Sequence, residues 1–312
     1  MPTSSTPLPP TTDDEASDAL PACVLVFNAS DPSGAGGLTG DITSIAAVGG
    51  HPVAVVTGAY ARDTAEVFEH FCFDDEAVAE QARAVLEDLP VQAIKVGFAG
   101  SPENLSAIAE IATDYAEVPL IAYMPNLSWW HDDRVDQYHD AFRELLLPQA
   151  SVLVGNHSTL WRWLLPEWSG TRSPSARDIA KAAAEQGVPY VLVTGIPAPE
   201  QHLENVLASA QTVLGSGKFE LFDATFAGAG DTLSATLAAL IANGSDLGEA
   251  TSEALAYLDR CLDHGFRPGM GHVLPDRMFW AESTDEDDNT ATSFEDTQPL
   301  EGFVMPPHDT QH

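Results

Sequence analysis

The sequence predicts an α/β fold with a mostly parallel central sheet, helices on its faces and antiparallel strands at one edge. Three observations support this prediction. Short apolar runs alternate with amphipathic stretches, as in βαβ units. The segment 202–222 breaks the alternation with strand-like runs on either side of a Gly-Ser-Gly turn at 215–217. Glycine and asparagine follow most of the apolar runs, where loops would begin.

Each predicted element follows from hydrophobic periodicity. Parallel strands buried on both faces are apolar and β-branched, and six runs fit that description: 23–28, 52–57, 93–96, 120–124, 152–154 and 190–194. Helical periodicity between them predicts helices over 74–89, 102–115, 135–147 and 173–186. Two further helices, 230–243 and 247–264, follow the antiparallel segment.

These elements form one predicted domain, residues 21–281. Residues 1–20 are acidic and rich in Ser, Thr and Pro, while residues 282–312 are acidic, contain proline and lack periodicity. Such segments bury too little apolar surface to order themselves. We therefore predict a mobile tail at each end.

The charge of the chain excludes some classes of partner. The 312 residues include 47 acidic residues and 13 Lys and Arg, a formal net charge of -34. The tails hold few of the acids, four in 1–20 and nine in 281–312, so the excess belongs mainly to the folded part. Nucleic acid and anionic membranes attract basic surfaces, so we expect neither as a partner. An acidic surface of this kind is consistent with adaptation to high salt, where ions screen self-repulsion.

The compartment is predicted from the cysteines and the N-terminus. Cys23, Cys72 and Cys261 are odd in number and fit no metal-ligand spacing, which favours a reducing compartment. No secretory signal is recognisable, and no apolar run reaches the ~20 residues of a membrane span. We expect a cytoplasmic protein.

A Gly-rich turn at 228–230 joins the antiparallel segment to a helix, and Asp231 follows it. The small residues Gly228, Ala229 and Gly230 let backbone N–H groups approach an anion, and the helix adds the positive end of its dipole. Asp231 then supplies a proton acceptor beside the anion, as a kinase acting on an alcohol requires. The alternative at this stage is an ordinary helix start with an acidic first turn.

A second Gly-rich connection follows the first strand and runs from Asn28 to Asp41. Ligands of open α/β sheets bind outside the carboxyl ends of the strands. The Gly and Asn residues after the other strands, such as Gly97, Asn126 and Asn156, therefore predict a backbone-lined pocket at that edge.

The motifs resemble one family along most of the chain. They are SDPSG at 30–34 with the glycines leading to Asp41, VVT at 55–57, Asp63-Thr64, AIKVG at 93–97, LLLPQ at 145–149, GAGDTLSA at 228–235 and Gly271-His272. In this order they resemble the hydroxymethylpyrimidine and phosphomethylpyrimidine kinases of thiamine biosynthesis, in the ribokinase-like superfamily. The resemblance covers about 24–280 and implies a three-layer α/β/α kinase domain.

The resemblance also implies roles. ATP and Mg²⁺ would phosphorylate the hydroxymethyl group of 4-amino-5-hydroxymethyl-2-methylpyrimidine, its monophosphate, or both. Asp231 would be the base and Gly228 to Gly230 the anion hole. Asp31, Thr39 and Phe98 match the substrate pocket, and Asn156, Thr194 and Gly195 match the nucleotide side. Homodimers are common in the family.

The chain also departs from the family pattern. Asp231 stands where the family usually has Cys, and Thr39 where it has a Gln that reads the pyrimidine. Two carboxylates and a lysine near Mg·ATP are replaced, in the segments AYMP at 122–125, NHST at 156–159 and TGI at 194–196. Two alternatives therefore stay open: a weakened homologue that binds or regulates, and a kinase for another small alcohol such as a pyridoxal-like compound or a sugar.

Other conspicuous residues have simpler explanations. Lys95, one of three lysines, lies in a predicted strand, and a structural pair with a carboxylate is the expectation. Trp129 and Trp130 form either a flap over the site or an exposed loop. Trp161 is expected to pack rather than to stack on a ligand. The histidines show no metal-ligand spacing, so the residues that would bind a metal stay unknown.

Overall fold

The structure, a computed structural model, describes residues 20–281. Its described part contains one nine-stranded sheet in the order β3-β2-β1-β4-β5-β6-β7-β8-β9. The strands are β1 Cys23–Ser30, β2 His51–Arg62, β3 Val67–Cys72, β4 Val91–Val96, β5 Leu120–Met124, β6 Val152–Asn156, β7 Tyr190–Ala198, β8 His202–Ala208 and β9 Val213–Glu220. The tails predicted at 1–20 and 282–312 lie, apart from residue 20, outside the described residues.

The sheet is parallel in its centre and antiparallel at both edges. β2, β1, β4, β5, β6 and β7 pair in parallel, and β8 and β9 continue the sheet antiparallel to β7. This confirms the prediction for 202–222. The other edge carries a further antiparallel strand, β3, paired with β2.

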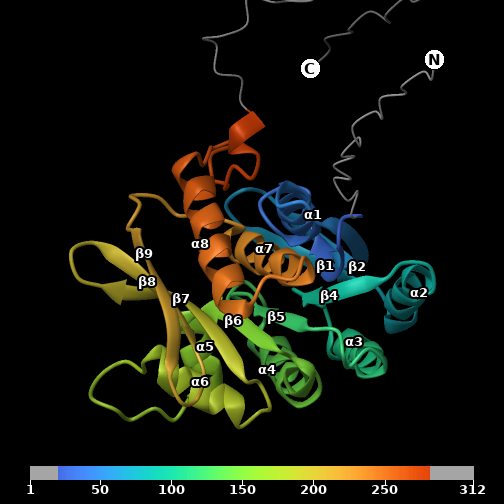
Figure 1. Ribbon diagram of the computed structural model, residues 1–312, viewed down its shortest axis with the longest axis horizontal. Helices are drawn as coiled ribbons and strands as arrows, with labels where there is room; N and C mark the ends of the chain where they lie inside the picture. The colour runs from blue at the N-terminus through green and yellow to red at the C-terminus, as the bar shows by residue number, and fades with distance from the viewer. Residues whose placement is uncertain (1–19, 282–312) are drawn as a thin grey trace, which may run out of the picture. The chain divides into compact units, whose positions relative to one another are not determined.

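Helices cover both faces of the sheet (Figure 1). They are α1 Gly37–Ala47, α2 Asp75–Leu86, α3 Pro102–Asp114, α4 Asp132–Ala141, α5 His157–Leu164, α6 Ala176–Ala184, α7 Ala229–Ala242 and α8 Leu247–Asp263. A π-helical turn, Phe142–Leu146, and two 3₁₀ turns, Leu147–Gln149 and Phe279–Ala281, complete the described elements.

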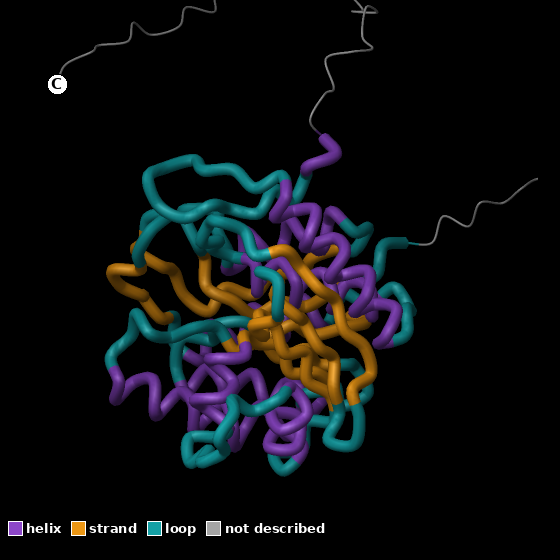
Figure 2. The backbone as a smooth tube through the Cα atoms, turned by 90° about the vertical axis from the view of Figure 1, so that its left-hand side faces the viewer, coloured by secondary structure: helices purple, strands orange, loops and turns teal. Residues whose placement is uncertain are grey.

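Two hydrophobic cores hold these layers together. Side chains of α2, α3, α4, α5 and α6 pack on one face of the sheet, and those of α1, α7 and α8 on the other. Figure 2 shows the strands between the two groups of helices. The fold is therefore the three-layer α/β/α arrangement predicted from the sequence. Of the described residues, 20–279 form one compact unit, and residues 280 and 281 belong to a second.

Helix α7 is buried almost all round, although its sequence includes hydroxyl residues. Thr232, Ser234 and Thr236 donate their side-chain hydroxyls to the carbonyl oxygens of Gly228, Gly230 and Thr232, one turn earlier. These bonds satisfy the hydroxyls inside the helix itself. The helix can therefore lie against the sheet with its hydroxyl groups hydrogen-bonded, and Thr232 also accepts a bond from Arg277 outside the helix.

The strand order reverses beside β1, and this positions the site. The chain runs from β1 outward through β2 to β3 and then returns to β4 on the other side of β1. Such a switch point opens a crevice at the carboxyl ends of the two strands. Among residues 20–281, no helix combines the length and the hydropathy that a membrane span needs.

Candidate active site

The helix that carries Asp231 begins at Gly228, whose backbone conformation is left-handed with φ of 88°. A Cβ at this position would collide with the carbonyl oxygen of Ala35. Only glycine therefore allows the loop after β1 to lie against the start of α7. The close approach brings the two Gly-rich segments of the sequence together.

The side chain of Arg277 forms hydrogen bonds with both of these segments. Its buried guanidinium donates to the carbonyl oxygens of Gly34 (3.3 Å) and Gly228 (3.4 Å), and its Nε donates to Thr232 Oγ1 (2.9 Å). A further bond reaches the carbonyl of Ala35. One side chain thus links the loop after β1 to the first turn of α7.

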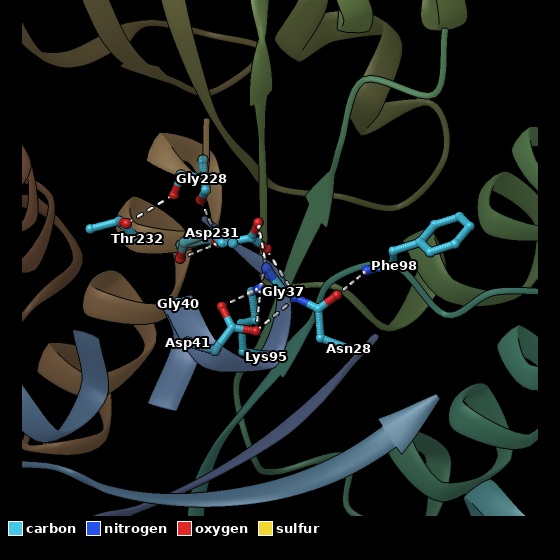
Figure 3. A network of polar contacts seen from close by, with 12 residues as sticks. Asn28, Gly37, Gly40, Asp41, Lys95, Phe98, Gly228, Asp231 and Thr232 are labelled. Carbon is cyan, nitrogen blue, oxygen red and sulfur yellow. Dashed lines mark hydrogen bonds and ion pairs between the residues drawn. The ribbon is translucent and has the colours of Figure 1, made fainter. Parts of the chain in front are cut away.

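Asp231 lies at the switch point with both carboxylate oxygens engaged (Figure 3). Its Oδ1 accepts hydrogen bonds from Asn28 Nδ2 (2.9 Å) and Lys95 Nζ (3.2 Å). Its Oδ2 accepts one from the backbone N–H of Gly37 (3.1 Å). Because Oδ2 has a single donor, it keeps more capacity to accept a proton than Oδ1. The side chain is 16% exposed, so the carboxylate is both fixed and accessible.

Lys95 is completely buried beneath Asp231. Its Nζ contacts both oxygens of Asp41, at 2.7 and 2.9 Å, in addition to Asp231. Burial alone would lower the pKa of Lys95, but the two carboxylates outweigh it and raise the pKa above its usual value. Burial raises the pKa of Asp41 above its usual value, although the charge of Lys95 counteracts the rise.

A cavity of about 570 Å³ opens in front of Asp231. Aromatic rings of Tyr60, Tyr123 and Trp129 line it together with Gly228. Burial raises the pKa of Tyr123 further above neutral pH, and the Asp231 charge adds to the effect, so this phenol stays protonated. The Tyr123 hydroxyl lies against the Cα of Gly230, at the turn that was predicted to bind an anion.

Aromatic packing continues behind the cavity. The ring of Phe98 stacks on Tyr60 (5.8 Å between centroids) and meets Trp129 and Trp130 edge-on. Phe98 is itself buried and forms the layer behind the cavity wall. Trp129 lines the cavity, which agrees with the first of the two alternatives for the Trp129-Trp130 pair, a loop over the site.

Two other residues predicted for the substrate side form hydrogen bonds within the loop after β1 or to it. The carboxylate of Asp31 is buried, accepts from the backbone of Ser33 and Gly36, and pairs with Arg62 at 3.2 Å. Arg62 lines the cavity, whereas Asp31 does not. Thr39 is exposed on α1, and its hydroxyl donates to the carbonyl of Asp31 (3.2 Å). It is not part of the cavity lining.

The residues predicted for the nucleotide side lie together at the end of β6 and in the middle of β7, where the pairing of β7 with β8 is irregular. Asn156 pairs with Thr194 across the two strands, and its Oδ1 accepts the N–H of Ser158 to cap α5. Gly195 has φ of 68° and its N–H donates to Asn205 Oδ1 (3.1 Å). These residues do not line the cavity in front of Asp231.

A second cavity, of about 430 Å³, lies beside the first. It is lined by polar and backbone groups of 222–225 and by Arg267, Gly271 and His272. His272 lines both cavities, so they adjoin at this residue. Arg267 and His272 were not predicted as site residues, although Gly271-His272 is one of the motifs.

The polar network beneath Asp231 was also missed. Asn28 and Asp41 were seen only as the limits of a Gly-rich connection, and Lys95 was expected to form a structural pair. Lys95 does pair with Asp41, but the lysine also contacts Asp231. A lysine inside an apolar strand of a chain with few lysines was the one available signal, because a buried ammonium requires a carboxylate nearby.

Comparisons with known proteins show the family to which the chain is related. The family model described as phosphomethylpyrimidine kinase matches residues 31–276. A hydroxymethylpyrimidine/phosphomethylpyrimidine kinase of Rhizobium meliloti is 29% identical, covering 84% of this chain and 100% of the relative.

Solved structures show the same fold. An ADP complex of Bacillus subtilis pyridoxal kinase gives a TM-score of 0.72 at 20% identity and covers 82% of this chain and 97% of its own. Pyridoxal kinase from Staphylococcus aureus with AMP-PCP and pyridoxal gives 0.71 at 19% identity, with coverage of 82% and 93%. The family model spans most of the chain, and on this ground the chain belongs to the phosphomethylpyrimidine kinase family, a ribokinase-like family of kinases.

Proposed function

We propose that the protein transfers the γ-phosphoryl group of ATP to the hydroxymethyl group of 4-amino-5-hydroxymethyl-2-methylpyrimidine, or to the phosphate group of its monophosphate, in thiamine biosynthesis. The observation that carries this proposal is the fixed carboxylate of Asp231, which faces a cavity at the N-terminus of α7. Membership of the family supports the substrate class. The curated relative named above is described as acting on these pyrimidines.

The first turn of α7 suits the phosphoryl group. The first N–H groups of a helix have no partner within the helix, and the helix dipole favours an anion there. Gly228, Ala229 and Gly230 form this turn, and the protonated hydroxyl of Tyr123 lies beside it. These donors would stabilise the negative charge of the transferring group.

Asp231 would act as the general base. Its Oδ2 would take the proton of the alcohol as the oxygen attacks phosphorus. Lys95 and Asn28 hold Oδ1, so the carboxylate cannot rotate away from the cavity without breaking both bonds. Tyr60, Tyr123 and Trp129 would enclose the heteroaromatic ring of the substrate.

The nucleotide would occupy the second cavity. That cavity adjoins the first at His272 and carries the cationic side chain of Arg267, which suits phosphates. The complexes of the pyridoxal kinases with ADP and AMP-PCP support ATP as the donor. Asn156, Thr194 and Gly195 stay candidates for contacts with the nucleotide.

The described residues 20–281 contain no group of three or more His, Cys, Asp or Glu side chains that could hold a metal ion. Mg²⁺ usually reaches kinases on the phosphates of ATP, with waters and one or two carboxylates completing its shell. When bound, it would neutralise phosphate charge. We assign no residue of this chain as its ligand.

Replacing Asp231 with Asn tests the proposed base. The change removes the proton acceptor while preserving the size of the side chain, so we expect kcat to fall about 10² to 10⁴-fold, as for other general bases. Release of ADP should be measured with the pyrimidine alcohol, its monophosphate, pyridoxal and a sugar. Asp246→Asn is the matched control, since Asp246 is exposed and caps the next helix, which Asn also caps well.

The same assay separates the alternatives. ADP release with pyridoxal or the sugar but with neither pyrimidine would replace the proposed substrate by another small alcohol. No ADP with any of the alcohols, while they still raise the unfolding temperature, would favour the weakened, ligand-binding homologue. Undiminished turnover in Asp231→Asn would contradict the assignment of the base.

The remaining parts of the proposal concern the setting of the enzyme. Cys23, Cys72 and Cys261 are unpaired in the described part of the chain, which supports the proposed cytoplasmic location. Assembly as a homodimer is proposed by analogy with the family alone.

A further inference from the structure

Two carboxylates beneath the cavity share the same two donors (Figure 3). Asn28 Nδ2 donates to Asp41 Oδ2 (2.8 Å) and to Asp231 Oδ1 (2.9 Å). Lys95 Nζ donates to both oxygens of Asp41 and to Asp231 Oδ1 (3.2 Å). Asp41 and Lys95 have no exposed side-chain surface, whereas Asp231 reaches the cavity. Asp41 therefore touches the proposed base only through shared partners.

Charge counting shows why this arrangement matters. With both carboxylates ionised, the cluster of Asp41, Lys95 and Asp231 carries one net negative charge in a buried place. Proton transfer to Asp231 leaves Lys95 and Asp41 as a neutral ion pair, which is the less costly state in a poorly solvated interior. The second carboxylate therefore favours uptake of a proton by Asp231, while the lysine opposes it.

Other ionisable groups face Asp231 from each neighbouring element. Tyr60 comes from β2 and Tyr123 from β5, and the pKa of each is raised, chiefly by burial and then by the Asp231 charge, so both are neutral. Arg277, which follows α8, is a cation whose guanidinium is directed at backbone carbonyls and Thr232. The opposed charges in direct contact with the base network are therefore those of Asp41 and Lys95.

We propose that Asp41 and Lys95 are positioning residues that set the proton affinity of Asp231, with Asp41 drawing part of the lysine charge away from the base. This inference rests on the proposed kinase function. In the transfer step, the bond from the alcohol oxygen to phosphorus forms and the bond from phosphorus to the β,γ-bridging oxygen breaks. ADP leaves with that electron pair. The alcohol proton moves to Oδ2 of Asp231, and Lys95 keeps its own proton.

The two positioning residues have opposite effects on the proton affinity of Asp231. Their variants should therefore shift the acidic limb of the kcat/KM profile in opposite directions. In Asp41→Asn the lysine charge acts on Asp231 alone, and the acidic limb of the kcat/KM profile moves to lower pH. In Lys95→Met two carboxylates are left without a cation, and the limb moves to higher pH. A charge at this distance typically moves a titration by about 1 to 3 units. One unit below the wild-type midpoint, Asp41→Asn should retain several-fold more of its plateau activity than wild type.

A titration that needs no turnover provides the second measurement. The carboxyl ¹³C signals of labelled aspartates should be followed by NMR against pH, with Asp231 assigned from Asp231→Asn. The midpoint of the Asp231 signal should shift in the same two directions. Asp246→Asn and Lys181→Met, which change exposed residues on α8 and α6, should leave the midpoint unchanged.

The outcomes separate this inference from the proposed function. Shifts in opposite directions in the titration support the network, and matching shifts of the kinetic limb support its role in the reaction. Titration shifts without ADP release by the wild type would remove the kinase role and with it the positioning role. Unchanged midpoints in Asp41→Asn would overturn the inference directly. If Lys95→Met does not fold, Asp41→Asn alone still tests the inference. In that variant Lys95 and Asp231 remain as an ion pair without net charge.

Discussion

His70 shows how burial sets the behaviour of a single residue near the site. It is 6% exposed, and its ring lies 4.9 Å from that of Phe98 and 5.4 Å from that of Tyr60. Among the described residues, no hydrogen-bond partner reaches its Nε2. Burial lowers the pKa of His70 to about 4, with Glu69 partly opposing the shift. The imidazole is therefore neutral and packs as an aromatic ring.

The lowered pKa of His70 predicts a pH-dependent loss of stability. Between pH 6.5 and about 4 the unfolded state binds a proton at this residue and the folded state does not, so the free energy of unfolding falls as the pH falls. The full loss from this group is about 3 kcal/mol. Urea unfolding of wild type and His70→Phe across this range measures it.

The phenylalanine variant keeps a ring in the cluster but cannot bind the proton, so its stability should depend less on pH. His51→Phe, a change at the exposed first residue of β2, should retain the wild-type dependence. Parallel curves for wild type and His70→Phe would show that His70 does not contribute to the dependence.

At the scale of the element, the start of α7 depends on one glycine for two separate reasons. Gly228 has a left-handed backbone, and a Cβ there would also collide with the carbonyl of Ala35. Gly244, just past the C-terminal end of the same helix, has φ of 97° but open space around its Cβ. The two glycines therefore separate backbone strain from loss of the close approach.

Replacing each glycine with Ala should distinguish these effects. Both changes place a side chain in the left-handed region, which costs about 1 to 2 kcal/mol of stability. Only Gly228→Ala should also separate the loop after β1 from the turn that precedes Asp231, with turnover at least tenfold lower. Thermal unfolding and ADP release measure the two effects. Equal turnover in the two variants would mean that the close approach is not needed for activity.

The elements that the sequence predicted are those with strong local patterns. Helix α3 carries Ser101 as its N-cap and a proline in its first turn, and its predicted span of 102–115 differs from the observed one by a single residue. Strand β3 was missed because only His70 of its six residues is buried, so no apolar alternation marks it. Helix α5 was not among the predicted helices, because its eight residues are too few to show a clear helical period.

The site divides in the same way between local and tertiary information. The turn at Gly228 and the acceptor at Asp231 are adjacent in sequence and could be proposed from it. The partners of Asp231 lie 203 residues away at Asn28 and 136 residues away at Lys95. Their contact depends on the strand order around β1, which no local pattern reveals.

At the scale of the whole molecule, the acidic excess of the composition lies on the surface. The chain has 13 Lys and Arg against 47 acidic residues. Lys95 and Arg277 are buried, but so are Asp31 and Asp41, so burial does not reduce the acidic excess of the described residues. Surface ion pairs such as Arg83 with Glu80 contribute little to stability. Self-repulsion among the exposed carboxylates should therefore oppose folding at low salt.

Salt should stabilise this protein because it screens the repulsion among the exposed carboxylates. The screening length falls from about 10 Å at 0.1 M to about 3 Å at 1 M, so KCl should raise the unfolding temperature. Each kcal/mol gained corresponds to a rise of roughly 2 to 4 °C for a chain of this size.

Sucrose is the control, because it favours compact states without screening charge. Glu87→Lys with Glu110→Lys, at exposed positions of neighbouring helices, should reduce the increment from KCl. An unfolding temperature that does not rise between low and molar KCl would contradict adaptation to high salt, and an equal rise in the double variant would assign the effect to something other than the surface charge.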